Sequence, residues 1–223
     1  MITAEQKPFD EIYAMVKEYG KLCILGCGSC VTVCMAGGEK EVNIMASVLN
    51  MAHEKSGSRA EIREAVIERQ CDREFFDSVA DDIVWSDAVL SMACGVGVQM
   101  CAEVFPDKRI FPALDTRFYG AAESQGIWIE KCAGCGRCIV HEFGGICPIA
   151  RCSKNLLNGP CGGSQDGMCE IDPENTPCGW QLIYDRMKEL GMADRLEENQ
   201  PLKDWSTGRS GGPGKIIKED MVL

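Results

Sequence analysis

An apolar run that ends in glycines and cysteines starts at residue 21 and reads Lys21-Leu22-Cys23-Ile24-Leu25-Gly26-Cys27-Gly28-Ser29-Cys30. Residues 21–25 have the length and composition of a buried strand, and Gly26 ends the run. Residues 39–55 follow, with apolar side chains at helical spacing before Gly57. These side chains are Val42, Met45, Val48, Leu49 and Ala52. The pattern predicts a strand, a loop and an amphipathic helix.

The same alternation continues to about residue 120. Short apolar runs cover residues 63–68, 88–93 and 110–114, and helical patterns cover residues 8–19, 72–80 and 97–104. Strands that alternate with helices are typical of a parallel sheet flanked by helices. We therefore predict an α/β domain over residues 1–120, with a small parallel sheet and cysteines at its strand ends.

Residues 121–223 show little of this periodicity. Eight of the fifteen cysteines lie between residues 127 and 180, in a segment that is also rich in glycine and proline. Chain of this kind rarely packs by itself, so we predict a loop-rich cysteine domain that is held together by metal. Apolar residues return at helical spacing at Leu182, Ile183, Met187 and Leu190. They predict a C-terminal helix with these four side chains facing inward, which an extended polar tail follows.

The overall composition argues against several classes of protein. Lys and Arg number 23 against 34 Asp and Glu, and the resulting net charge of −11 disfavours nucleic acid as a partner. No segment has the roughly 18 apolar residues of a membrane helix, and residues 1–10 do not resemble a secretion signal. We therefore expect a cytoplasmic protein without membrane insertion. Because cytoplasmic thiols stay reduced, the fifteen cysteines favour metal binding over disulfides.

Four cysteines of the first half follow predicted strands, and these are Cys27, Cys30, Cys71 and Cys94. Parallel strands end at one edge of a sheet, so thiols that are far apart in sequence can meet there. Neighbouring glycines let backbone N–H groups approach sulfur, as an anionic iron–sulfur cluster requires. We predict that these four cysteines bind a cluster, and the alternative is that they bind no metal.

The other three cysteines of the first half have less defined roles. Cys23 lies within the predicted strand, which favours a small buried apolar residue over a ligand. Cys34 and Cys101 are either additional ligands or core residues on the first turns of their helices.

In the second half, Cys132, Cys135 and Cys138 form a C-x2-C-x2-C run, and Cys147-Pro148 follows after eight residues. Three thiolates at this spacing and a remote Cys-Pro are typical of ferredoxin-type [4Fe-4S] sites, although the usual gap is three residues. The candidates for completing the site, or for forming a second one, are Cys147, Cys152, Cys161, Cys169 and Cys178. Zinc also binds four thiolates, and it stays an even alternative for the later cysteines.

The sequence offers no catalytic residue. It contains no nucleophile elbow, no Walker-type phosphate loop and no spaced histidine pair with an acid. Val31 stands where a dinucleotide fingerprint needs its third glycine. His53 falls late in an amphipathic helix, and we expect it at the surface.

Two motifs carry a family resemblance. They are Cys147-Pro148-Ile149-Ala150-Arg151-Cys152 and Asn158-Gly159-Pro160-Cys161-Gly162-Gly163. Together with residues 169–179 and the first-half cysteines, they resemble the small cysteine-rich subunit of the methylenetetrahydrofolate reductase of acetogenic and related anaerobic bacteria.

The resemblance implies an iron–sulfur electron-transfer subunit in the one-carbon metabolism of the Wood–Ljungdahl pathway. Such a subunit would bind two or three [4Fe-4S] clusters through the cysteines named above, with zinc as a further metal. Its partner would be the flavin-containing catalytic subunit, which converts 5,10-methylenetetrahydrofolate to 5-methyltetrahydrofolate. A further donor subunit or a ferredoxin would exchange electrons with it. The chain is not expected to be active alone.

Two alternative functions stay open. In the first, zinc or iron–sulfur sites only fold the second half and dock it on a partner. In the second, the chain is an electron-transfer adaptor for a different redox enzyme.

Overall fold

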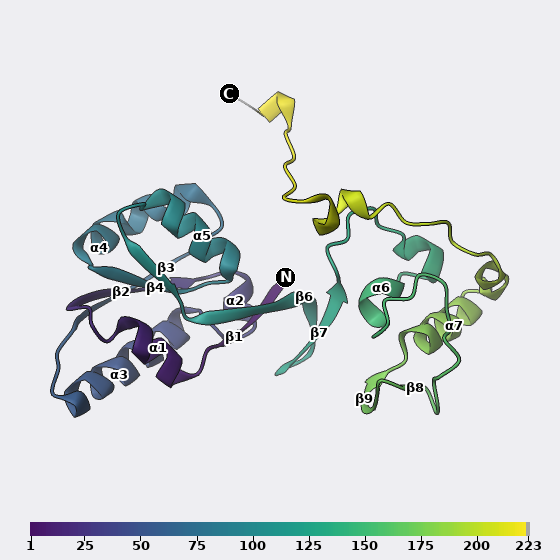
Figure 1. The fold of residues 1–223 in the computed structure, drawn as a ribbon, viewed down its shortest axis with the longest axis horizontal. Coiled ribbons are helices and arrows are strands. Elements are labelled where there is room, and N and C mark those ends of the chain that lie inside the picture. The colour runs from purple at the N-terminus through teal and green to yellow at the C-terminus, as the bar shows by residue number, and fades with distance from the viewer. Residues whose placement is uncertain (222–223) are drawn as a thin grey trace. The chain divides into compact units, whose positions relative to one another are not determined.

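The structure is a computed structural model that describes residues 1–221. The chain divides into two compact units, of which the first is Met1–Ile129 and the second starts at Glu130. The elements of the first unit (Figure 1) are β1 (Ile2–Gln6), α1 (Phe9–Val16), β2 (Lys21–Cys27), α2 (Cys30–Val33), α3 (Glu39–Ser56), β3 (Glu61–Ile67), α4 (Ala80–Trp85), β4 (Ala88–Met92), α5 (Gly95–Val104), β5 (Arg109–Pro112), β6 (Leu114–Ser124) and β7 (Ile127–Cys132).

A four-stranded sheet in the order β3-β2-β4-β5 forms the centre of the first unit, and all of its pairs are parallel. The predicted mixed α/β architecture with a parallel sheet is therefore confirmed. Helices α1 and α3 cover one face of the sheet, and α4 and α5 cover the other (Figure 1). Because both faces are covered, β2 is a continuous apolar run rather than an alternating one.

Alternate residues of β2 belong to two separate cores. Leu22 and Ile24 pack on the side of α3, where Leu49 is also fully buried. Cys23 and Leu25 pack on the opposite side, in a cluster with residues of α4 and α5. Full burial of one such aliphatic side chain contributes about 1.5–3 kcal/mol, so β2 supplies a large part of the stability of this unit.

A second sheet, in the order β1-β6-β7, was not predicted from the sequence. Strand β1 pairs antiparallel with β6, so that Ile2 lies opposite Tyr119. The partners are more than 100 residues apart in the chain, and the short N-terminal run shows no strong periodicity. Residues 73–79, where a helix was expected, form a 3-10 helix that leads into α4.

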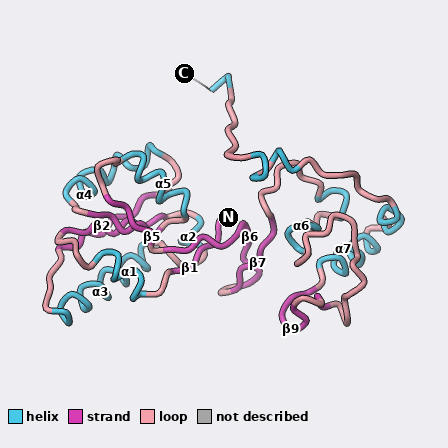
Figure 2. Tube along the Cα trace, viewed as in Figure 1, coloured by secondary structure: helices cyan, strands magenta, loops and turns pink. Residues whose placement is uncertain are grey.

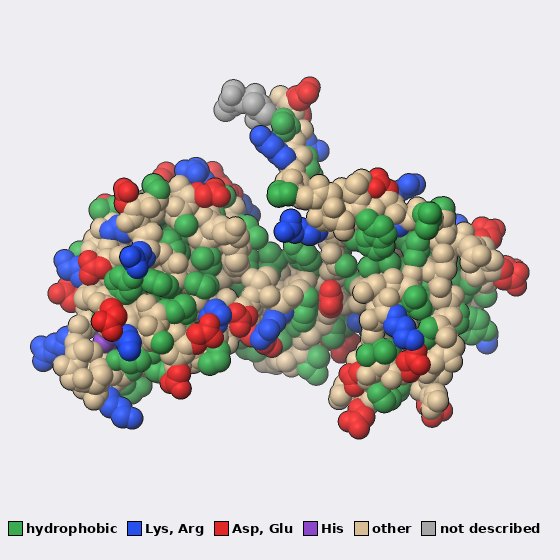
Figure 3. Space-filling view, viewed as in Figure 1, with side chains coloured by type: hydrophobic (Ala, Val, Ile, Leu, Met, Phe, Trp, Pro, Cys, Tyr) green, Lys and Arg blue, Asp and Glu red, His purple; other side chains and the backbone are tan. Residues whose placement is uncertain are grey.

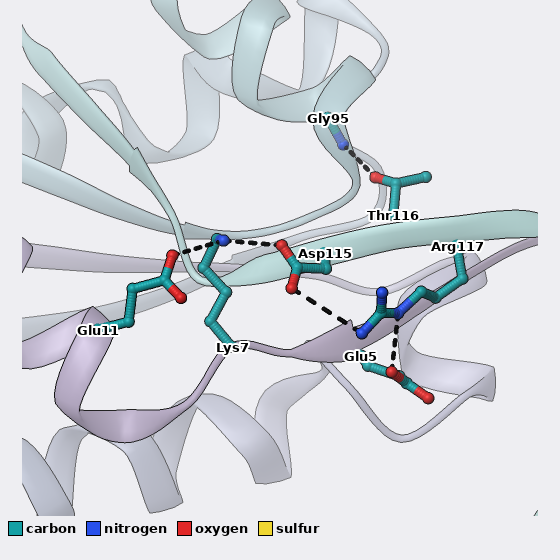
Figure 4. A network of polar contacts seen from close by, with 7 residues as sticks. All are labelled: Glu5, Lys7, Glu11, Gly95, Asp115, Thr116 and Arg117. Atoms are coloured by element: carbon teal, nitrogen blue, oxygen red, sulfur yellow. Dashed lines mark hydrogen bonds and ion pairs between the residues drawn. The ribbon is translucent and has the colours of Figure 1, made fainter.

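Polar contacts connect β6 to the start of the chain and to α5 (Figure 4). Lys7 Nζ lies 2.7 Å from both Glu11 Oε1 and Asp115 Oδ1. These hydrogen bonds raise the pKa of Lys7 and lower that of Asp115. Thr116 Oγ1 accepts a hydrogen bond from the backbone N–H of Gly95 at 2.9 Å. The second sheet therefore holds the first turn of α5 in place.

The second unit contains little regular structure (Figure 2). Its elements are α6 (Pro148–Arg151), β8 (Met168–Cys169), β9 (Asp172–Pro177) and α7 (Gly179–Glu189), with short 3-10 turns. The predicted C-terminal helix is present as α7, and Ile183 and Met187 are fully buried. Leu190, however, is 44% exposed, so its predicted inward position is wrong, because the helix already ends at Glu189.

The surface carries both signs of charge. On the face drawn in Figure 3, Lys and Arg side chains are interspersed with Asp and Glu. Within residues 1–221, no helix combines the length and the apolar character that crossing a membrane requires.

The core position of β2 leads to a prediction about stability. We expect Ile24→Ala to lower the free energy of unfolding of the first unit by about 2–5 kcal/mol, because Ile24 is fully buried and a cavity would remain. Denaturant unfolding, followed by circular dichroism, measures the change. The control is Val84→Ala at a position that is 63% exposed, where a comparable loss would contradict this account of the core.

Candidate metal centres

The carboxyl edge of the parallel sheet carries the cysteines that the sequence singled out. Cys27 is the last residue of β2, and Cys30 begins α2. Cys71 follows β3, and Cys94 precedes α5 directly after β4. Because β3 and β4 are the two neighbours of β2, these residues leave three adjacent strand ends.

The environment of Cys27 shows that some of these thiols are close together. Burial is the main reason why the pKa of Cys27 is raised, and the charges of Cys94 and Cys71 raise it further. Hydrogen bonds from the backbone of Ser29 and Gln70 act in the opposite direction and favour the thiolate. Cys30 instead lies near Cys34. The charge of Cys30 raises the pKa of Cys34. The structure thus brings Cys27, Cys71 and Cys94 into one electrostatic neighbourhood.

Cys23, Cys34 and Cys101 are core residues. Cys23 and Cys101 are fully buried in the same apolar cluster, and burial raises the pKa of each to about 12. The prediction that Cys23 is a small buried apolar residue is confirmed. Cys34 is buried on the other side of the sheet, where its Sγ donates to Ala4 O at 3.5 Å.

The C-x2-C-x2-C run begins at Cys132, the last residue of β7, and lies in the second unit. Cys132 Sγ accepts a hydrogen bond from the backbone N–H of Gly134 at 3.4 Å. Gly134 and Gly136 have φ angles of 60° and 85°, and these left-handed conformations let the loop turn around its cysteines. Cys135 is half-buried, whereas Cys132 and Cys138 are exposed.

Cys147 lies beside the start of this run. It precedes α6, and its Sγ accepts a hydrogen bond from the backbone N–H of Ala150 at 3.4 Å. Cys147 and Lys131 line one cavity of about 360 Å³, and Lys131 directly precedes Cys132. Of the five cysteines that could complete the run, Cys147 is the one that shares a cavity with the segment leading into it.

The segment around Thr207 covers the cysteine loop, which the sequence did not reveal. The backbone N–H of Arg137 donates to Thr207 Oγ1 at 3.2 Å, and Lys203 Nζ donates to Arg137 O at 2.5 Å. Gly208 approaches so closely that an added Cβ would lie 2.8 Å from the carbonyl carbon of Cys135. This part of the tail folds back on its own unit rather than extending away.

The four remaining cysteines line one small cavity of about 20 Å³, and these are Cys152, Cys161, Cys169 and Cys178. Such a volume is close to that of one water molecule. Two charged residues stand beside it: Lys154 pairs with Glu170, and Cys161 Sγ donates to Glu170 Oε1 at 3.4 Å. Cys169 Sγ lies 3.4 Å from Ser153 Oγ, and this contact is the main reason why the pKa of Cys169 is lowered.

In the described part of the chain the side chains are not gathered into a formed metal site. Among residues 1–221, no three side chains of histidine, cysteine, aspartate or glutamate are close enough to hold one metal ion.

His53 lies in α3, away from the cysteine groups, whereas His141 lines the same cavity as Cys138. His53 is only 3% exposed, so its predicted surface position is wrong. Its Nδ1 lies 2.8 Å from Ser58 Oγ, and its ring packs edge-on against Tyr13. The packing of α3 against α1 covers this position, which helical periodicity alone assigned to solvent. His141 contacts the neighbouring Glu142 in an exposed turn.

Fold and site together define a cysteine-rich α/β protein whose thiols gather at one sheet edge and in one loop-rich unit. The family model described as "Methylene-tetrahydrofolate reductase C terminal" matches residues 111–206, a little less than half of the chain, and all eight second-unit cysteines lie within the match. The match supports a protein related to methylenetetrahydrofolate reductase. Neither a curated protein nor a solved structure matches the chain.

The burial differences lead to a prediction about thiol reactivity. In the reduced, metal-free chain, iodoacetamide at pH 8 should leave Cys23 and Cys101 unmodified and should label the exposed thiols, which are Cys71, Cys132, Cys138 and Cys161. Thiolate is the reactive form, and a pKa of about 12 leaves very little of it at Cys23 and Cys101. Mass spectrometry of peptides measures the labelling. Fast labelling of Cys23 or Cys101 under conditions that preserve the fold would contradict their placement in the core.

Proposed function

We propose that this chain is the iron–sulfur electron-transfer subunit of a methylenetetrahydrofolate reductase complex. It would pass electrons to or from flavin on a catalytic partner, which converts 5,10-methylenetetrahydrofolate to 5-methyltetrahydrofolate. The observation that carries the proposal is the family match over the segment that contains all eight second-unit cysteines. Iron–sulfur clusters transfer single electrons, and their potential depends on burial and on hydrogen bonds to sulfur.

In the first unit, Cys27, Cys30, Cys71 and Cys94 would hold one [4Fe-4S] cluster. The donor set fits, because four thiols are the ligands that such a cluster takes and three of them leave adjacent strand ends. The backbone of Ser29 and Gln70 already supplies hydrogen bonds to the sulfur of Cys27. These bonds favour the thiolate form, which is the form that binds metal.

In the second unit, Cys132, Cys135, Cys138 and Cys147 would hold a second cluster. The N–H groups of Gly134 and Ala150 point at two of the four sulfurs, which stabilises negative charge there. The segment around Thr207 and Gly208 lies over Cys135 and would limit the access of water. Both features act on the potential of a bound cluster.

Cys152, Cys161, Cys169 and Cys178 would hold a single zinc ion, with a third cluster as the alternative. The support for zinc is that these four thiols line one cavity, because four thiolates are a usual donor set for a structural zinc ion. The four thiols would turn toward the cavity on binding. Lys154 would offset part of the negative charge of the thiolates. Its pKa is raised mainly by the hydrogen bond to Glu170 and also by Cys161.

The reductive step would belong to the partner. The chain is proposed to relay electrons and not to bind folate. A donor subunit or a ferredoxin would exchange electrons with it. In this division of labour the chain would need no catalytic residue of its own.

A structural role is the second candidate function, and one observation favours it. The buried apolar core of the second unit is small, and consists of Phe143, Cys178, Trp180, Ile183 and Met187. A unit with so small a core gains much of its stability from bound metal. In this reading the metal would fold the second unit for docking on a partner, and electrons would not pass through it.

The metal content of the anaerobically purified chain tests the proposal. We expect about eight iron and eight sulfide per chain from two clusters, and about one zinc. The visible absorbance should decrease on addition of dithionite. A colourless protein with zinc and no iron would contradict the electron-transfer role and leave the structural one. Isolation with a redox partner that contains no flavin would point to an adaptor for a different enzyme.

The first cluster gives a site-specific prediction. Cys27→Ser should remove about half of the iron, because one of four thiolates at the sheet edge is lost. Iron analysis and the electron paramagnetic resonance spectrum of the reduced chain measure the change. The matched control is Cys101→Ser, a change of the same chemistry at a core thiol. Equal iron loss in the two variants would mean that folding, and not ligation, explains the effect.

The small cavity gives a separate prediction. Cys161→Ser should remove the zinc, leave the iron content unchanged and lower the melting temperature of the second unit, because the metal would stabilise its fold. Zinc analysis and thermal unfolding check both effects. Loss of iron instead of zinc would assign Cys161 to a cluster.

A further inference from the structure

A buried amide lies among the three strand ends that carry the cysteines of the first unit. Gln70 is fully buried and directly precedes Cys71. Its Nε2 donates to Leu25 O at 2.7 Å and to Gly26 O at 3.1 Å. Its Oε1 accepts a hydrogen bond from Ser91 Oγ at 2.7 Å. One side chain thus bonds to β2 just before Cys27 and to β4 just before Cys94.

The position of these bonds explains why an amide is needed. The ladder between β2 and β4 ends at the pair Gly26 and Met92. Leu25 and Gly26 are the last two residues of β2 that pair with β4, and the amide of Gln70 donates to the carbonyls of both at this end of the ladder. Ser91 in turn satisfies the oxygen of the amide.

Gln70 also determines where the first turn of α5 lies. An added Cβ on Gly97 would lie only 2.7 Å from Cβ of Gln70 and 2.8 Å from Cβ of Ala93. Helix α5 therefore packs closely on Gln70, and Cys94 directly precedes this helix. The side chain accordingly contacts all three segments that lead to Cys27, Cys71 and Cys94.

We propose that Gln70 is a positioning residue that sets the relative placement of Cys27, Cys71 and Cys94. The inference rests on the proposed function only in the identity of the ligand, an iron–sulfur cluster. The placement of the three thiols at one edge of the sheet is a property of the chain itself. A purely structural amide would stabilise the fold without affecting the geometry of the thiols.

Gln70→Leu is the main test variant, because leucine is apolar, has a similar size and lacks all three hydrogen bonds. Ser91→Ala removes one bond and serves where Gln70→Leu does not fold. The matched control is Ser86→Ala, which removes a buried hydroxyl whose bond, to Ile83 O at 2.9 Å, lies away from the cysteine edge. Circular dichroism of each variant verifies that helix and sheet content is retained.

The first measurement uses the anaerobically purified full chain. Gln70→Leu should shift the paramagnetic resonance spectrum and the midpoint potential of the first cluster, or lose about half of the iron, while Ser86→Ala matches the wild type. An unchanged spectrum, potential and iron content would overturn the proposal. Wild-type chain without iron would overturn the proposed function and leave the role of Gln70 to the second measurement.

The second measurement does not depend on iron. Dibromobimane becomes fluorescent when it bridges two neighbouring thiols, and peptide mapping of the reduced, metal-free chain identifies the bridged pairs. Bridging of Cys27 to Cys71 or Cys94 should be at least fivefold slower in Gln70→Leu, and slower to a smaller extent in Ser91→Ala. Wild-type bridging rates in both variants, even with a lowered melting temperature, would reduce Gln70 to a structural residue and overturn the proposal.

Discussion

Burial of β2 on both faces constrains the arrangement of the first unit. The strand pairs in parallel with β3 and β4, and all three strands therefore end at the same edge. Cys27 ends β2, and Cys71 and Cys94 follow its two neighbours. Gln70 then connects these ends by hydrogen bonds to β2 and β4. The thiols lie at one edge because the core requires the strands to lie side by side, and not because the thiols attract one another.

The two units differ in how their folds are stabilised. The first has apolar cores on both faces of its sheet. The second has one small core around Trp180, which includes Cys178, and most of its other cysteines lie in or beside loops and turns. In the proposed function, bound metal would add stability mainly to the second unit. In the first unit the cluster would bind to cysteines whose positions the sheet already determines.

Much of the first unit was predictable because its apolar patterns are local. The apolar patterns of residues 21–27 and 39–56 depend only on the spacing of residues within one element. Both elements form where they were expected. The antiparallel sheet of β1 and β6 was missed, since its partners are more than 100 residues apart. His53 was placed wrongly for a related reason, because the contact that buries it comes from Tyr13 on another helix.

The sequence by itself determined the class of fold, the number and spacing of the thiols and the expectation that three strand ends would carry them. Tertiary structure alone decided that Cys34 and Cys101 are core residues, and which thiols share a cavity, as for Cys152 and Cys178. It also placed Gln70 between the strands. Spacing along the chain describes only local geometry, whereas burial and hydrogen bonds between distant segments depend on how the elements pack.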